Sequence, residues 1–64
     1  MKLNGKEISL EGRIQLDVFL ENQGYKLTRI AAELNGRIIP KAEYPTTFLE
    51  DGDSLEVVTF VGGG

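Results

Sequence analysis

The dipeptide Asn-Gly occurs twice in this 64-residue sequence, at 4–5 and at 35–36, each time between short alternating runs of apolar and polar residues. Asn-Gly favours the two-residue type I′ turn, because both central residues of that turn need a positive φ. At the first copy, such a turn sets Leu3 opposite Lys6 and Met1 opposite Ile8. The predicted hairpin therefore gathers four apolar side chains on one face, those of Met1, Leu3, Ile8 and Leu10.

The second Asn-Gly pair lies inside the stretch RIAAELNGRIIP and predicts a second hairpin. One of its faces carries four apolar residues, Ile30, Ala32, Leu34 and Ile39. Glu33 and Ile38 share the other face. Pro40 ends the returning strand, because proline cannot donate to a strand ladder.

The stretch IQLDVFLENQG changes the period of the apolar residues and predicts the one clear helix. Leu16, Phe19 and Leu20 stand at i, i+3 and i+4, which puts them on one helix face. Gly24 stands where a helix ends in a left-handed residue. Asp17 belongs to the first turn, where the helix dipole favours an acidic side chain, although no Ser or Thr stands at the expected N-cap.

The stretch KAEYPTTFLEDGDS reads mostly as a connection, with a short helical turn expected near Lys41–Tyr44. Pro45 rules out a regular ladder there. Tyr44 and Phe48 are its expected apolar anchors, and Asp51-Gly52 predicts a tight turn before the last strand.

The last predicted strand runs over Ser54–Val61. One of its faces carries Leu55, Val57, Thr59 and Val61, and the other carries Glu56, Val58 and Phe60. A strand that is apolar on both faces is usually central in its sheet. The order of elements then predicts an α+β fold of the β-grasp type, in which a mixed sheet of four to five strands packs on one main helix with the C-terminal strand in the middle.

Composition narrows the classes of function that this chain can serve. It has no cysteine and no histidine, so it lacks disulfides, thiolate metal ligands and the commonest general base. A net charge of −3 argues against a nucleic-acid partner. No apolar stretch is long enough to span a membrane, and the N-terminus lacks the apolar core of a signal peptide, so we expect a cytoplasmic protein.

Four segments of the chain form a characteristic combination: LNGKEI, LNGRIIPKAEY, LEDGDSLEVV and the closing VTFVGGG. Together they resemble the ThiS family, the ubiquitin-like sulfur carriers of thiamine biosynthesis. The resemblance covers the full length. It implies a β-grasp domain over residues 1–61 and a flexible glycine tail over 62–64, of which Gly63 and Gly64 form the pair that the family needs and Gly62 is additional.

The chemistry that this resemblance implies takes place at the Gly64 carboxylate. A ThiF-like activating enzyme adenylates it with ATP and Mg, and a persulfide donor supplies sulfur to leave a thiocarboxylate. A ThiG-like thiazole synthase then receives the sulfur. The chain would be a carrier rather than an enzyme, would bind no cofactor itself, and is expected to be a monomer when alone.

Two further expectations concern binding. Val58 and Phe60 are expected to dock a partner from the sheet face opposite the helix, and Val61, on the other face of the strand, is expected to bind the partner as well. The alternative is that a neighbouring loop covers Val58 and Phe60. The carboxylates Glu50, Asp51 and Asp53 are interpreted as solvated turn residues rather than a metal site.

Other functions stay open at this point. The nearest is the small subunit of molybdopterin synthase, which shares the fold and the Gly-Gly end; the identity of the partner enzyme separates the two. Another is a ubiquitin-like modifier or interaction module, in which Gly64 would form an isopeptide bond with a lysine. The non-functional alternative for the glycine tail is a disordered end or a truncated linker.

Overall fold

The strand β7 (Ser54–Thr59) runs through the middle of a five-stranded sheet in the computed structural model, which describes residues 1–60. The spatial order of the sheet is β2 (Lys6–Glu7), β1 (Lys2–Leu3), β7, β4 (Ile30–Leu34) and β5 (Arg37–Ile38). β1 is parallel to β7, whereas β4 is antiparallel to it along its whole length. The predicted mixed sheet with a central C-terminal strand is confirmed.

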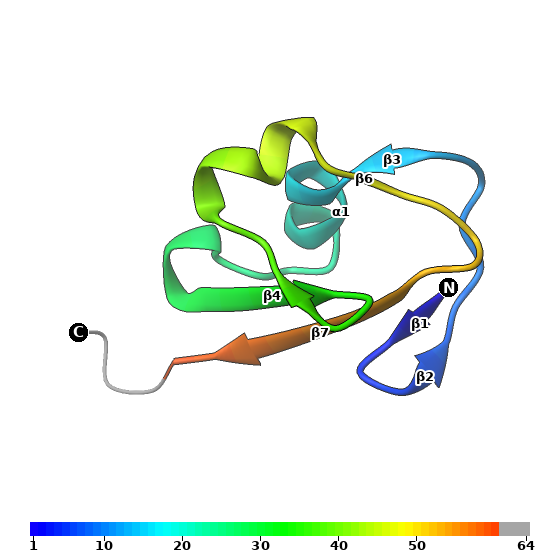
Figure 1. The fold of residues 1–64 in the computed structure, drawn as a ribbon, viewed down its shortest axis with the longest axis horizontal. Helices are drawn as coiled ribbons and strands as arrows, with labels where there is room; N and C mark the ends of the chain where they lie inside the picture. The colour runs from blue at the N-terminus through cyan, green and yellow to red at the C-terminus, as the bar shows by residue number, and fades with distance from the viewer. Residues whose placement is uncertain (61–64) are drawn as a thin grey trace.

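A single layer of helices covers one face of this sheet (Figure 1). It consists of α1 (Leu16–Asn22) and two 3₁₀ segments, η1 (Leu27–Arg29) and η2 (Lys41–Thr46). The predicted helical stripe is confirmed, because Leu16, Phe19 and Leu20 are all buried. η2 confirms the helical turn expected near Lys41–Tyr44 and continues through Pro45.

The C-terminus of α1 is closed by backbone hydrogen bonds around Gly24, which has a φ of +90°. The Tyr25 N–H donates to the Leu20 carbonyl and the Gly24 N–H to the Glu21 carbonyl, each at 3.0 Å. This pair of bonds is a Schellman motif, and it needs a left-handed residue at the position of Gly24. At the other end, Gln15 occupies the N-cap, but its side chain does not cap the helix and instead donates to the Pro45 carbonyl at 2.8 Å, in keeping with the missing Ser or Thr.

The core lies between the helix layer and the sheet. It contains Met1, Leu16, Phe19, Leu20, Ile30, Ala32, Ile39, Tyr44, Leu49, Leu55 and Val57. Tyr44 is the anchor that the sequence predicted, but its Oη makes no hydrogen bond within the described chain. Burial raises the pKa of this phenol, and the nearby Ala32 backbone partly offsets that shift.

A second, two-stranded sheet was not predicted. It pairs β3 (Ile14–Gln15) antiparallel with β6 (Phe48–Leu49). The sequence had assigned the first of these segments to the start of the helical stretch and the second to a connection. The prediction of Phe48 as an anchor is wrong. Successive residues of a strand point to opposite sides, so the fully buried Leu49 turns inward while Phe48 remains 38% exposed. The Arg13 guanidinium lies 4.1 Å from the centroid of the Phe48 ring.

The last strand is shorter than predicted. β7 ends at Thr59, where its partner β4 begins at Ile30. Val61 lies outside the described residues, as do Gly62, Gly63 and Gly64. The division into a domain over 1–61 and a flexible tail over 62–64 therefore stays a prediction. Among residues 1–60, no helix is long and apolar enough to cross a membrane.

Both Asn-Gly turns have the predicted conformation, and both are bonded to β7. Asn4 and Asn35 have φ values of 51° and 52°, and the glycines that follow them are also positive. Asn4 Oδ1 accepts the Val57 N–H at 2.7 Å, so the asparagine continues the ladder where β1 ends. Asn35 Oδ1 accepts the Ser54 N–H at 2.9 Å.

These contacts predict unequal costs for the same substitution at the two turns. Asn4→Gly keeps the positive φ but leaves the partly buried Val57 N–H without its acceptor, so the free energy of unfolding should fall by about 1–3 kcal/mol. Asn35→Gly removes bonds that are exposed to water, and it should cost about 1 kcal/mol or less. Urea unfolding of both variants measures the difference. Equal stability of Asn4→Gly and the unchanged chain would contradict the role given to the Asn4 amide.

Candidate functional site

The end of β7 is where the chain leaves the sheet toward the predicted carrier residues. The Phe60 N–H donates to the Arg29 carbonyl at 2.7 Å, which holds the backbone to the start of β4 up to the last described residue. Gly62, Gly63 and Gly64 lie beyond it, so their predicted role is not tested by the fold. The structure does describe the surface of the sheet next to the residues that lead to these glycines.

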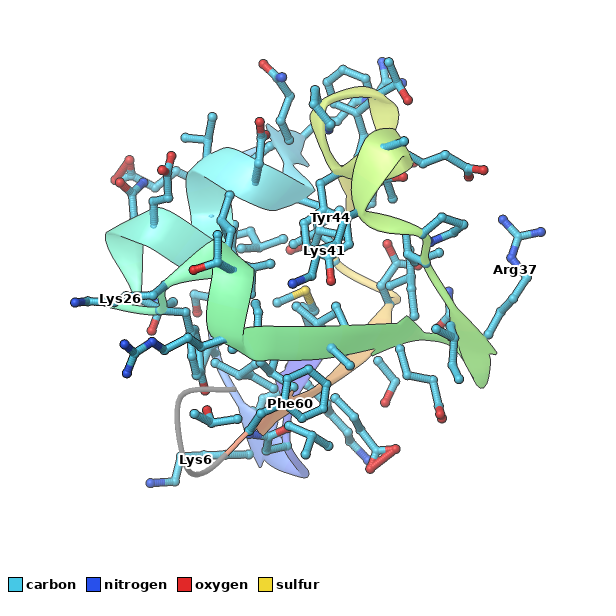
Figure 2. All side chains as sticks on the ribbon, turned by 90° about the vertical axis from the view of Figure 1, so that its left-hand side faces the viewer. Lys6, Lys26, Arg37, Lys41, Tyr44 and Phe60 are labelled. Atoms are coloured by element: carbon cyan, nitrogen blue, oxygen red, sulfur yellow. The ribbon has the colours of Figure 1, made fainter. Side chains whose placement is uncertain are left out.

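The sheet face opposite the helices carries the predicted docking residues. Val58 is 60% exposed and Phe60 is 54% exposed, and no described loop covers them. Figure 2 shows Phe60 on the side of the sheet away from Tyr44. Their exposure agrees with the docking interpretation, although binding itself stays a prediction.

Ile38 on β5 belongs to the same surface and was not proposed as a docking residue from the sequence. It is 69% exposed, the largest exposed fraction among the large apolar side chains of the described chain. The register could have indicated it, since Ile38 is the cross-strand partner of Glu33, and that face is turned away from the core. We call the surface formed by Ala31, Glu33, Ile38, Glu56, Val58 and Phe60 the open sheet face.

A hollow of about 190 Å³ lies on the open sheet face. Its lining residues are Ala31, Ala32, Glu33, Ile38, Glu56 and Val58. It exists because Ala31 is small and stands opposite Val58 in the ladder between β4 and β7. The open sheet face is thus both apolar and indented, which suits a protruding side chain of another protein.

The acidic turn before β7 has a structural use at Asp53. One oxygen of its carboxylate accepts the Glu50 N–H at 2.8 Å, and the other accepts the Asn35 side-chain amide at 3.0 Å. The Asp53 N–H donates in turn to the Glu50 carbonyl at 3.0 Å. These bonds close the predicted Asp51-Gly52 turn and join it to the second Asn-Gly hairpin. No group of three or more potential metal ligands occurs within residues 1–60.

A family model described as the ThiS family matches residues 1–64. The sulfur carrier protein ThiS of Thermus thermophilus is 40% identical over 62 residues, which cover 97% of this chain and 95% of that protein. A crystal structure of the thiamine biosynthesis protein ThiS from Geobacter metallireducens is similar in fold, with a TM-score of 0.84 at 27% identity. It covers 98% of this chain and 96% of that one.

A longer relative is also similar to this chain. The thiazole synthase of Paramagnetospirillum magneticum is 36% identical over 62 residues, which are 97% of this chain but 19% of that protein. The chain therefore spans about a fifth of the length of that synthase, and one segment of the synthase resembles it.

Proposed function

The chain belongs to the ThiS family, and from this premise we propose that it is a sulfur carrier of thiamine biosynthesis. The observation that carries the proposal is the family match over the whole of residues 1–64, which includes Gly63 and Gly64. The Thermus thermophilus relative, which bears the name sulfur carrier protein, is similar over nearly its whole length and supports the same role.

The proposed chemistry takes place at Gly64. A ThiF-like activating enzyme binds ATP with Mg, and the Gly64 carboxylate oxygen attacks the α-phosphate, which forms an acyl adenylate and releases pyrophosphate. A persulfide sulfur then attacks the acyl carbon and AMP leaves, which gives an acyl disulfide. A second thiol cleaves the S–S bond, so that one sulfur remains on Gly64 as a thiocarboxylate and the other forms a disulfide.

The sequence around Gly64 suits this chemistry. Glycine has no side chain to obstruct a narrow channel, and it reaches backbone conformations closed to other residues. The chain contains no cysteine and no histidine that could compete for the activated sulfur or catalyse its transfer. We therefore propose that the chain is a substrate and carrier of partner enzymes rather than an enzyme, with no cofactor of its own.

A ThiG-like thiazole synthase is the proposed acceptor of the sulfur. The support comes from the thiazole synthase of which one segment resembles this chain. A carrier and the enzyme that uses it benefit from a shared chain, because linkage raises their effective concentration. On this ground we propose a ThiG-like thiazole synthase as a partner of this chain.

The first prediction concerns the product. Incubation with ATP, Mg, a ThiF-like activating enzyme and a persulfide donor should replace one carboxylate oxygen by sulfur, and fragmentation should map the gain in mass to the last peptide. A variant that lacks both Gly63 and Gly64 keeps a single terminal glycine, so it is the matched control and should gain no sulfur. Isopeptide conjugates in place of the thiocarboxylate would instead favour a protein modifier, and sulfur on any internal residue would sink the proposal.

The second prediction concerns recognition by the activating enzyme. Phe60→Ala removes an exposed side chain, so the melting temperature should change by less than about 3 °C. Burying that side chain at an interface contributes roughly 1.5–3 kcal/mol, so the affinity should fall about tenfold to a hundredfold.

Phe48→Ala is the matched control for Phe60→Ala, because it truncates a partly exposed phenylalanine of β6, outside the open sheet face. Its affinity should stay within about twofold of the unchanged chain. An unchanged affinity of Phe60→Ala, or a loss of stability large enough to account for the weaker binding, would show that Phe60 is not a recognition residue.

A further inference from the structure

Two carboxylates face each other on the open sheet face. Glu33 of β4 and Glu56 of β7 are direct partners in the antiparallel ladder. Like charges directly opposite each other in a sheet are destabilising. The ladder therefore places two acidic side chains next to each other on this face.

The described part of the chain offers these carboxylates no cation. Its only ion pair joins the Met1 amino group to Glu7, at 3.0 Å. Lys2 pairs with Ser54, the residue two before Glu56 on β7, but no ion pair forms between Lys2 and Glu56. Figure 2 shows Arg37 extending away from the edge of the sheet. The charge of the Glu33–Glu56 pair is thus not balanced within residues 1–60.

The two carboxylates flank the hollow of the open sheet face. Ala31 and Val58 form the next pair on this face, two residues from Glu33 and Glu56 toward the end of β7, and Ile38 stands beside Glu33 on β5. At about 190 Å³ the hollow is smaller than the roughly 300–1,000 Å³ of typical small-molecule sites. Its size and its combination of two charges with apolar walls fit a single side chain.

We propose that this hollow binds an arginine or lysine side chain of the activating enzyme, with the charged group between Glu33 and Glu56. This deepens the proposed function and rests on it. The aliphatic stem of the basic side chain would lie along Ala31, Ile38 and Val58, as long cationic side chains do on apolar surface. A guanidinium suits the site best, because its planar donors can bond to two carboxylates at once.

The hollow adjoins the predicted docking residues, and for this reason we infer that the same partner, the activating enzyme, covers both. Val58 lines the hollow, and Phe60, just past the end of β7, follows it two residues later on the same face of the sheet. A protein that covers Phe60 would therefore also lie beside the hollow. The cation would neutralise the pair only in the complex, so the charge repulsion of the free carrier would be relieved by binding.

The test uses the full chain with Glu33→Gln and Glu56→Gln, separately and together. Each single variant should raise the Kd for the ThiF-like activating enzyme about tenfold and flatten its dependence on salt, because a charge-assisted contact is lost. The same variants should melt about 2–5 °C higher, because the repulsion in the free protein is removed.

Glu21→Gln is the matched control, since Glu21 is exposed on α1, on the side of the sheet opposite the open sheet face. Its Kd, salt dependence and melting temperature should match those of the unchanged chain. Gln variants of the pair that bind as tightly as this control would overturn the proposal. Weaker binding with a lower melting temperature would also overturn it, because the pair would then serve the fold.

The binding measurement separates this inference from the proposed function. Binding needs no ATP and no sulfur donor, whereas the thiocarboxylate needs both. Weakened binding of the Gln variants without any thiocarboxylate on the unchanged chain would support the docking site and refute the sulfur chemistry. Absence of binding by the unchanged chain would refute both.

Discussion

The backbone of β7 is the constraint on which the rest of the structure depends. It pairs with β1 in parallel on one side and with β4 in antiparallel on the other. The two Asn-Gly turns each send an asparagine side chain to it, at Val57 and at Ser54. Because Leu55 and Val57 project from β7 into the core, a change in its register would turn both out of the core.

A chain of this length can cover only one face of that sheet. α1 spans seven residues, and together with η2 it shields the side from which Leu55 projects. No described element remains to cover Ile38, Val58 and Phe60, so the opposite face stays both apolar and exposed. Small domains have little stability to spare. A like-charge pair that weakens the free fold, such as Glu33 and Glu56, therefore makes physical sense where a partner completes the surface.

The sequence was sufficient to predict a structural element wherever that element has a strong local signal. The positive φ that Asn4 and Asn35 adopt is a property of Asn-Gly itself, and the spacing of Leu16, Phe19 and Leu20 needs no tertiary information. The two-residue strands β3 and β6 carry no period that could indicate them, because their pairing is set by the packing around them. The prediction of Phe48 as an anchor was wrong for the same reason, since the buried residue of β6 is Leu49.

In the candidate site, too, some residues could be assigned from the sequence and others could not. Val58 and Phe60 could be assigned to the open sheet face from the alternation of the last strand, and the structure leaves both exposed. Ile38 and the facing of Glu33 with Glu56 required the register between three strands, which only the assembled sheet supplies. The hollow depends on the small size of Ala31 at one ladder position, a detail that no sequence pattern indicates.

The central claim is that the activating enzyme covers the open sheet face. The NMR signals of methyl groups on the two sides of the protein test this claim directly. Ile38 and Val58 carry methyl groups on the open sheet face, and Val18, 39% exposed on α1, carries them on the opposite side. Methyl NMR spectra of the labelled chain with the ThiF-like activating enzyme should show shifts or broadening at Ile38 and Val58 beyond those at Val18. Larger changes at Val18 than at Ile38 and Val58 would place the partner on the helical side and contradict this account of the sheet.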